Sequence, residues 1–220
     1  MTDYLRDLVD PKNHNWLLKR LVTVDQARRL ISLLEKVIRT NVLGDIVELG
    51  CFEGTTTVLL QRVRSNLGSK KSVHAYDSFQ GLPPANQWDS NILKAGALKT
   101  TPEAFTKNVI GLGGEVKNLH IGWFNETLPK ELPLNISFAL LDGDRYSSTM
   151  EGLTWVYPRL SPGAVVMLDD YGDPRFCGVK KACDQFLPGA IQVKETVSEK
   201  HYAVFSTGSV IGSPNTTGRN

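Results

Sequence analysis

Residues 45–54 read Asp-Ile-Val-Glu-Leu-Gly-Cys-Phe-Glu-Gly, a short apolar run that ends in a glycine-containing turn. A helical pattern follows from Thr55 to Val63, so the stretch predicts a buried strand, a tight turn and a helix. Gly50 and Gly54 would let the backbone approach a bound ligand closely, although a purely structural turn is an equally good interpretation. The dinucleotide-binding pattern G-x-G-x-x-G is absent because position 52 is Phe, which argues against a nicotinamide cofactor.

The alternation of strands and helices continues along the chain and predicts the fold class. Strand candidates lie at 45–49, 72–77, 117–121, 136–141 and 164–168, and a final pair with a weaker pattern lies at 192–193 and 202–205. Further helical patterns lie at 101–109, 148–160 and 179–186. Strands that alternate with helices form parallel sheets that are covered on both faces. The sequence therefore predicts an α/β fold with a mostly parallel seven-stranded sheet and helices on both faces.

The length of 220 residues fits one domain with smaller flanking segments. We expect residues 1–43 to be an N-terminal helical segment whose helix begins with a capping box at Thr23–Gln26. Its apolar face would pack on the core or, alternatively, serve as a lid or a dimer contact, so a homo-oligomer is possible. Residues 44–206 would form the ligand-binding domain, with a lid insertion at 82–115. Residues 207–220, rich in Gly, Ser, Thr and Asn, would form a flexible tail.

Composition and charge exclude several classes of partner. A net charge of +2 without a basic stripe gives no reason to expect nucleic acid or an acidic membrane surface. Three cysteines, Cys51, Cys177 and Cys183, do not build a disulfide framework and indicate a reducing compartment. No secretory signal and no apolar run of membrane-spanning length is present, so we expect a cytoplasmic protein.

Polar and aromatic residues follow the predicted strands at the edge where ligands bind. In open parallel sheets this edge is formed by the carboxyl ends of the strands. Asp77 ends the second strand, where it could accept hydrogen bonds from both hydroxyls of a ribose or simply cap the next turn. Trp123 follows the third strand and could stack on adenine or belong to the core.

Four aspartates give the strongest signal for chemistry. Asp142 and Asp144 end the fourth strand, and Asp169 and Asp170 end the fifth. Carboxylates gathered at one rim repel one another unless a cation lies among them. Oxygen ligands without His or Cys favour Mg²⁺, Mn²⁺ or Ca²⁺ over zinc. The competing interpretation is that some of these acids cap helices or point to solvent.

Taken in order, the motifs between Gly44 and Leu187 resemble those of the macrocin O-methyltransferase family. The motifs are Val47-Glu-Leu-Gly50, Tyr76-Asp-Ser-Phe-Gln-Gly-Leu-Pro83, Gly122-Trp-Phe-Asn-Glu-Thr-Leu-Pro129, Leu141-Asp-Gly-Asp-Arg-Tyr146, Leu160-Ser-Pro-Gly163 and Asp169-Asp-Tyr-Gly172. The resemblance implies a single-domain, Rossmann-like class I methyltransferase that uses S-adenosylmethionine and Mg²⁺. It also implies transfer of a methyl group to a hydroxyl of a small molecule, such as a sugar or phenol of a natural product or a glycan precursor.

The resemblance assigns roles by position. It implies Asp142, Asp169 and Asp170 as metal ligands and Asp144 as the general base. The residues that would contact the cofactor are Glu48, Gly50, Gly54, Thr55, Asp77, Ser78, Gly122, Trp123 and Asp142. Arg145 departs from the family because an apolar residue is usual there, on what we expect to be the substrate side.

Other functions stay open at the level of sequence. A nicotinamide-dependent oxidoreductase lacks its middle glycine at position 52, and a metal-dependent hydrolase would be expected to use histidine ligands. A non-catalytic cofactor-binding module would be expected to lose the four aspartates first.

Overall fold

A central sheet of six strands organises the computed structural model, which describes residues 3–18, 22–187, 196–197 and 200–207. The sheet strands are β3 (Asp45–Leu49), β4 (Val73–Asp77), β5 (Leu119–Ile121), β6 (Ile136–Leu141), β7 (Leu160–Leu168) and β10 (Ala203–Ser206). Their order is β10-β7-β6-β3-β4-β5, and only β10 runs antiparallel to its neighbour. The predicted α/β class with a mostly parallel sheet is confirmed.

The predicted count of seven strands is wrong for this sheet within the described residues, which supply six. The expected strand at 192–193 lies outside the described residues. Two further strands, β8 (Thr196–Val197) and β9 (Lys200–His201), pair with each other as a separate antiparallel hairpin and do not join the main sheet.

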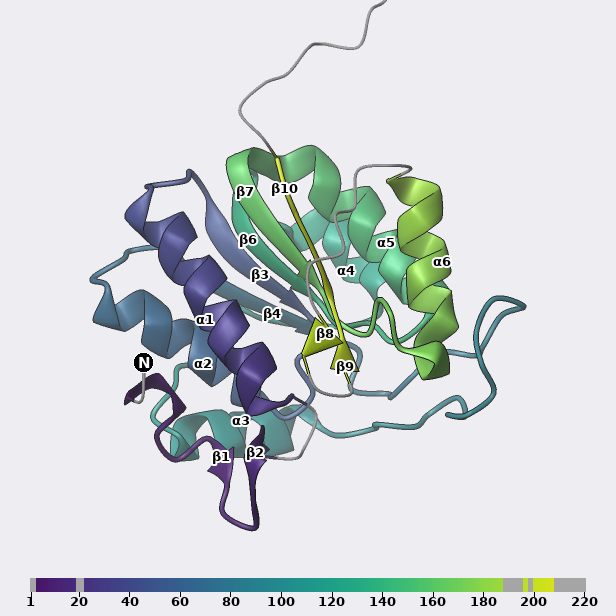
Figure 1. Cartoon of the computed structure of the whole chain (residues 1–220), viewed down its shortest axis with the longest axis horizontal. Helices are drawn as coiled ribbons and strands as arrows, with labels where there is room; N and C mark the ends of the chain where they lie inside the picture. The colour runs from purple at the N-terminus through teal and green to yellow at the C-terminus, as the bar shows by residue number, and fades with distance from the viewer. Residues whose placement is uncertain (1–2, 19–21, 188–195, 198–199, 208–220) are drawn as a thin grey trace, which may run out of the picture.

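Helices cover both faces of the sheet, as predicted (Figure 1). The helices are α1 (Val24–Arg39), α2 (Thr55–Asn66), α3 (Pro102–Gly111), α4 (Phe124–Glu131), α5 (Tyr146–Val156) and α6 (Cys177–Phe186), with short 3-10 turns η1 (Asp3–Leu5), η3 (Tyr157–Arg159) and η4 (Pro174–Phe176). Buried residues of α1, α2 and α3 form one apolar cluster with the sheet, and those of α4, α5 and α6 form the other. β6, which is buried along its whole length, lies between the two clusters.

The register of the central strands places the loops that follow them at one edge. Leu49 at the end of β3 is paired with Leu141 at the end of β6, and Leu141 is paired with Leu168 at the end of β7. The next residues along the chain, Gly50 and Asp142, are therefore neighbours, and the Asp142 amide donates to the Leu49 carbonyl at 2.8 Å. Because parallel strands share their direction, every residue that follows a strand emerges at this carboxyl edge.

The N-terminal segment contains more than the helix expected from the sequence. Strands β1 (Val9–Asp10) and β2 (Asn13–Leu17) form an antiparallel hairpin before α1. The predicted capping box is confirmed: Thr23 Oγ1 accepts a hydrogen bond from the Gln26 amide at 3.1 Å, and Gln26 Oε1 accepts one from the Thr23 amide at 2.9 Å. The apolar face of α1 packs on the core, which agrees with the simpler interpretation of its spacing.

The connection 82–115 contains α3, close to the helix predicted at 101–109, and is otherwise without regular structure. Residues 208–220 of the expected tail lie outside the described residues. Among the described helices, none combines the length and the apolar character needed to cross a lipid bilayer.

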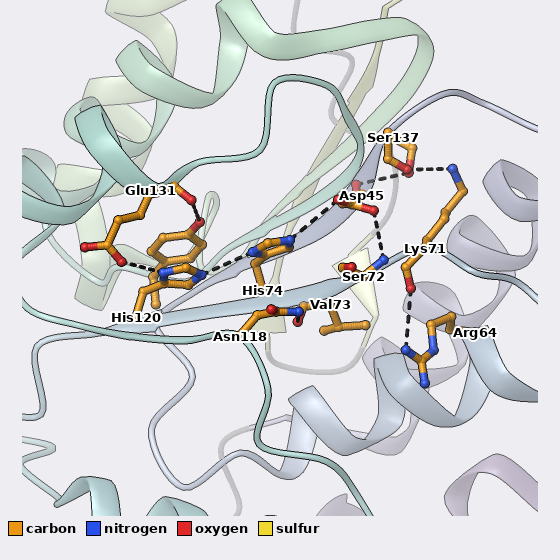
Figure 2. A network of polar contacts seen from close by, with 12 residues as sticks. Asp45, Arg64, Lys71, Ser72, Val73, His74, Asn118, His120, Glu131 and Ser137 are labelled. Atoms are coloured by element: carbon orange, nitrogen blue, oxygen red, sulfur yellow. Dashed lines mark hydrogen bonds and ion pairs between the residues drawn. The ribbon is translucent and has the colours of Figure 1, made fainter.

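A chain of titratable side chains joins β3, β4, β5 and α4 away from the carboxyl edge (Figure 2). Glu131 Oε2 lies 2.5 Å from His120 Nδ1, and His120 Nε2 lies 3.1 Å from His74 Nδ1. The neutral arrangement that fits has His120 Nδ1 donating to Glu131 and His74 Nδ1 donating to His120. In this arrangement His74 Nε2, 3.6 Å from the Asp45 carboxylate, carries no proton and becomes a donor to Asp45 only when His74 is protonated. Burial and the neighbouring His120 lower the pKa of His74, despite Asp45.

We expect His74 to make the free energy of unfolding depend on pH. Its pKa is below 6.5 in the folded state, so its contribution is full above pH 6.5 and is lost as the pH falls through the folded-state pKa. His74→Gln should flatten the fall in unfolding free energy between pH 7 and 5 by up to about 1.4 kcal/mol per pH unit. Urea unfolding across this range measures the slope, with exposed His14→Gln as the matched control. An unchanged slope in His74→Gln would contradict the expectation.

Candidate functional site

A cavity of about 700 Å³ opens at the carboxyl edge of the sheet. Its walls come from the loops after β3, β4, β5, β6 and β7, from the first turns of α4 and α5, from the connection 82–115 and from the N-terminal hairpin. The lining residues are Trp16, Gly50, Phe52, Asp77, Ser78, Gly81, Leu82, Pro83, Pro84, Leu93, Leu98, Trp123, Phe124, Asn125, Asp142, Gly143, Asp144, Ser147, Ser148, Glu151, Asp170, Arg175 and Phe176. The structure thus brings Gly50, Asp77, Ser78, Trp123 and Asp142 of the predicted cofactor set to one cavity.

The loop after β3 can reach the end of β6 only because residue 50 is glycine. A Cβ atom at Gly50 would lie 2.0 Å from the carbonyl oxygen of Asp142, and the backbone φ of +87° is itself unfavourable for other residues. The Gly50 amide donates to the Tyr76 carbonyl at 2.9 Å, which fixes the loop on its other side. Gly50, the first glycine of the predicted turn, is therefore a point where the backbones of two loops approach each other closely.

Asp77 holds this loop from the end of β4. Its Oδ2 accepts a hydrogen bond from the Phe52 amide at 2.8 Å, and its Oδ1 accepts one from the Phe79 amide at 2.8 Å. Burial raises the pKa of Asp77, and these backbone hydrogen bonds oppose the rise. Asp77 is thus both a turn-capping residue, as the simpler interpretation held, and a lining residue of the cavity.

Glu48 occupies a different place from the rest of the predicted cofactor set. Its side chain is 1% exposed and does not line the cavity. Glu48 Oε2 accepts a hydrogen bond of 2.5 Å from the hydroxyl of Thr57 on α2. Burial, with a smaller effect of the Asp77 charge, raises the pKa of Glu48 to about 8 in spite of that bond. Its described contacts are with the helix rather than with the cavity.

The remaining residues of the cofactor set lie at the borders of the cavity. Gly54 and Thr55 begin α2 and line a second, smaller cavity of about 40 Å³, next to Leu17 and Leu18 of the N-terminal segment. Trp123 lines the main cavity immediately before α4, and Gly122 precedes it.

Three of the four predicted acids come together at the other side of the cavity. Carboxylate oxygens of Asp142, Asp144 and Asp170 lie within 4.8 Å of one another, a grouping that could hold a metal ion. Asp144 and Asp170 have positive φ angles of 58° and 55°. Such backbone costs about 1–3 kcal/mol per residue and is concentrated at functional sites. Three oxygen ligands without histidine or cysteine fit a hard divalent cation.

Asp169 lies outside this group of three. Its Oδ1 accepts a hydrogen bond of 2.8 Å from Gln26 Nε2, and both side chains are buried. The orientation of the Gln26 amide is fixed because its Oε1 accepts from the Thr23 amide. The structure therefore connects Asp169 with the N-terminal helix, whereas the resemblance implied a metal ligand.

Several lining residues gave no recognisable signal in the sequence. Trp16 comes from a hairpin whose strand β2 is mainly polar, and Leu93 and Leu98 come from an irregular segment. Arg175 and Phe176 belong to the short turn η4 before α6. The capping box did identify Gln26, but its partner Asp169 lies 143 residues away in sequence.

Comparisons with known proteins agree with this geometry. The family model described as macrocin-O-methyltransferase (TylF) matches residues 19–199. The mycinamicin III 3''-O-methyltransferase of Micromonospora griseorubida is 27% identical over 70% of the chain and 65% of its own length. The demethyldecarbamoylnovobiocin O-methyltransferase of Streptomyces niveus is 32% identical over 70% of the chain and 60% of its own length. The chain thus spans less than two thirds of the length of these relatives.

Solved structures show the same fold. The O-methyltransferase NovP superposes with a TM-score of 0.76 at 22% identity, covering 94% of both chains. The calicheamicin methyltransferase CalS11 superposes with a TM-score of 0.67 at 20% identity, covering 94% of this chain and 93% of its own. With a family model that matches most of its length and a cavity where the family's motifs meet, the chain belongs to the macrocin O-methyltransferase family.

Proposed function

We propose that the chain is an S-adenosylmethionine- and Mg²⁺-dependent O-methyltransferase that methylates a hydroxyl of a small molecule. The observation that carries the proposal is the single cavity that has Asp77 on one strand end and the group Asp142, Asp144 and Asp170 on others. The names of the two curated relatives and of NovP support O-methyl transfer. We infer an acceptor of their kind, a sugar or phenol hydroxyl of a natural product or glycan precursor.

The cofactor half of the cavity would be the side of Gly50, Asp77, Ser78 and Trp123. The backbone amides of Phe52 and Phe79 donate to the Asp77 carboxylate, and backbone hydrogen bonds from Cys51 and Ser78 also lower its pKa, so the carboxylate is fixed in place at the cavity. Held in this way, the Asp77 carboxylate would accept hydrogen bonds from ribose hydroxyls. Trp123 would stack on the adenine ring, and S-adenosylmethionine would supply the methyl group.

The acidic half would bind the acceptor hydroxyl and remove its proton. Asp142 and Asp170 would hold a divalent ion, which when bound lowers the pKa of a nearby hydroxyl. Asp144 lies close enough to these two acids to serve the same hydroxyl as general base. Positioning the hydroxyl against the methyl donor is the remaining contribution of the protein. The walls of Trp16, Leu93, Leu98 and Phe176 would exclude water.

A transfer assay tests the function directly. Purified protein with S-adenosylmethionine and Mg²⁺ would be offered a panel of free and glycosidic deoxysugars, simple phenols and catechol, with methylated product detected by mass spectrometry. We expect methyl transfer to hydroxyl oxygen of at least one class. Methylation only of nitrogen or carbon positions would contradict the proposal.

Asp77→Ala should weaken binding of S-adenosylhomocysteine by about 1–3 kcal/mol, because hydrogen bonds to a charged group are lost. Calorimetric titration measures the affinity without an acceptor. Asp25→Asn, which changes an exposed acid of α1, is the matched control and should leave affinity unchanged. Tight binding of NAD by the wild-type protein, with no binding of S-adenosylhomocysteine, would refute the cofactor assignment.

Asp144→Asn and Asp170→Asn should lose activity in different ways. Loss of a general base lowers kcat by about 10²–10⁴, so Asp144→Asn should be slow at every Mg²⁺ concentration. Asp170→Asn should require more Mg²⁺ and recover part of its rate when Mg²⁺ is in excess. Initial rates against Mg²⁺ concentration distinguish the two.

Chelator should abolish wild-type activity and Mg²⁺ should restore it. Recovery of Asp144→Asn by excess Mg²⁺ would assign Asp144 to the metal instead of the proton. Full wild-type activity in chelator would rule out the metal altogether.

A further inference from the structure

Arg145, which we expect to depart from the family pattern, is buried next to the acidic group of Asp142, Asp144 and Asp170. It directly follows Asp144 and is 2% exposed. Its Nη1 donates to the Ser90 carbonyl at 3.0 Å and its Nη2 donates to the Leu93 carbonyl at 2.5 Å. Arg145 is not among the residues that line the cavity, although the sequence suggested the substrate side. Its guanidinium instead binds the backbone of a segment 52–55 residues earlier.

That segment, residues 88–93, is docked on the start of α5 by a second interaction. Asp89 Oδ1 accepts a hydrogen bond of 2.8 Å from the Tyr146 amide, the first amide of α5. Arg145 occupies the N-cap position of α5 and makes no side-chain cap bond there, so Asp89 supplies the cap from another part of the chain. A side chain at Gly178 would prevent this, because its Cβ would lie 1.9 Å from Asp89 Oδ1.

The docked segment also contacts the start of α6. Cys177 Sγ lies 3.2 Å from the Trp88 carbonyl, and the Ser90 hydroxyl donates to the Arg175 carbonyl. Lys181 Nζ lies 4.6 Å from the centre of the Trp88 ring. Residues 88–93 are therefore held at both ends, and Leu93 at the end of the segment lines the cavity.

We propose that Arg145 is a positioning residue for the acceptor, which holds the docked segment 88–93 so that Leu93 forms a fixed wall of the cavity. An apolar residue at this position would remove both charge-assisted hydrogen bonds to the half-buried carbonyls of Ser90 and Leu93, and with them the attachment of the segment to the start of α5. Because Arg145 adjoins Asp144, the wall and the acidic group are fixed by consecutive residues. The effect on the acceptor rests on the proposed methyltransferase function; the docking of the segment does not.

Hydrogen exchange tests the docking without any activity. In Arg145→Met, amides of residues 86–98 should exchange at least about tenfold faster than in the wild type, since two charge-assisted hydrogen bonds are lost. Exchange of α3 should not change. Arg159→Met is the matched control, because Arg159 also donates to a backbone carbonyl, that of Trp155, but away from the cavity. Equal exchange of residues 86–98 in wild type and Arg145→Met would overturn the proposal.

Kinetics with the best acceptor from the sugar and phenol panel tests the positioning. Arg145→Met should raise the acceptor KM about tenfold while kcat changes less than about threefold and S-adenosylhomocysteine affinity less than about twofold. Arg145→Lys keeps the charge and one donor direction, so it should fold and restore part of the KM. A loss confined to kcat, or equal losses in Arg145→Met and Arg159→Met, would overturn the positioning role. If no acceptor is methylated by the wild type, the proposed function fails, while the exchange result still decides the docking.

Discussion

The arrangement of the site depends on the contact between the backbone of Gly50 and the carbonyl oxygen of Asp142. Any side chain at position 50 would push the loop after β3 away from the end of β6. The two halves of the cavity, one around Asp77 and the other around the acidic group, would then separate. The strand register brings Gly50 and Asp142 together, because the residues before them, Leu49 and Leu141, are paired at the ends of their strands. A single missing methyl group thus sets the distance between the cofactor side and the acceptor side.

The cofactor side and the acceptor side of the cavity differ in how negative charge is stabilised. On the cofactor side, Glu48 is buried with one hydroxyl as donor, and the rise of its pKa to about 8 favours the neutral acid near neutral pH. When Glu48 is neutral, the buried region that it shares with Asp77 contains one carboxylate charge instead of two, which avoids repulsion between them. On the acceptor side, three aspartates lie within 4.8 Å of one another, an arrangement that a divalent cation would stabilise. Positive φ angles occur in both halves, at Phe52 and Phe79 beside Asp77 and at Asp144 and Asp170 in the acidic group.

Features encoded by local pattern could be predicted from the sequence, whereas those that depend on tertiary pairing could not. The buried run of β6 and the capping box of α1 are local signals, and both are present in the structure. The strand-end rule brought Asp77 and Asp142 to the cavity, because it depends only on strand direction. The hairpin at 9–17 was missed because β2 is mainly polar and its pairing is short. The contact of Glu48 with Thr57 and the burial of Arg145 follow from packing that no periodicity encodes.

The hydrogen bond between Gln26 and Asp169 has a consequence for the order of folding. The two residues are 143 positions apart, so the bond closes a loop that contains most of the sheet. Contacts of such long sequence separation form slowly, because the entropy of loop closure is lost before the contact forms. During synthesis, the hairpin and α1 leave the ribosome well before β7 and its terminal aspartates. The acidic rim therefore reaches its final form only after the last parallel strand has joined the sheet, and the N-terminal segment remains without its Asp169 partner until then.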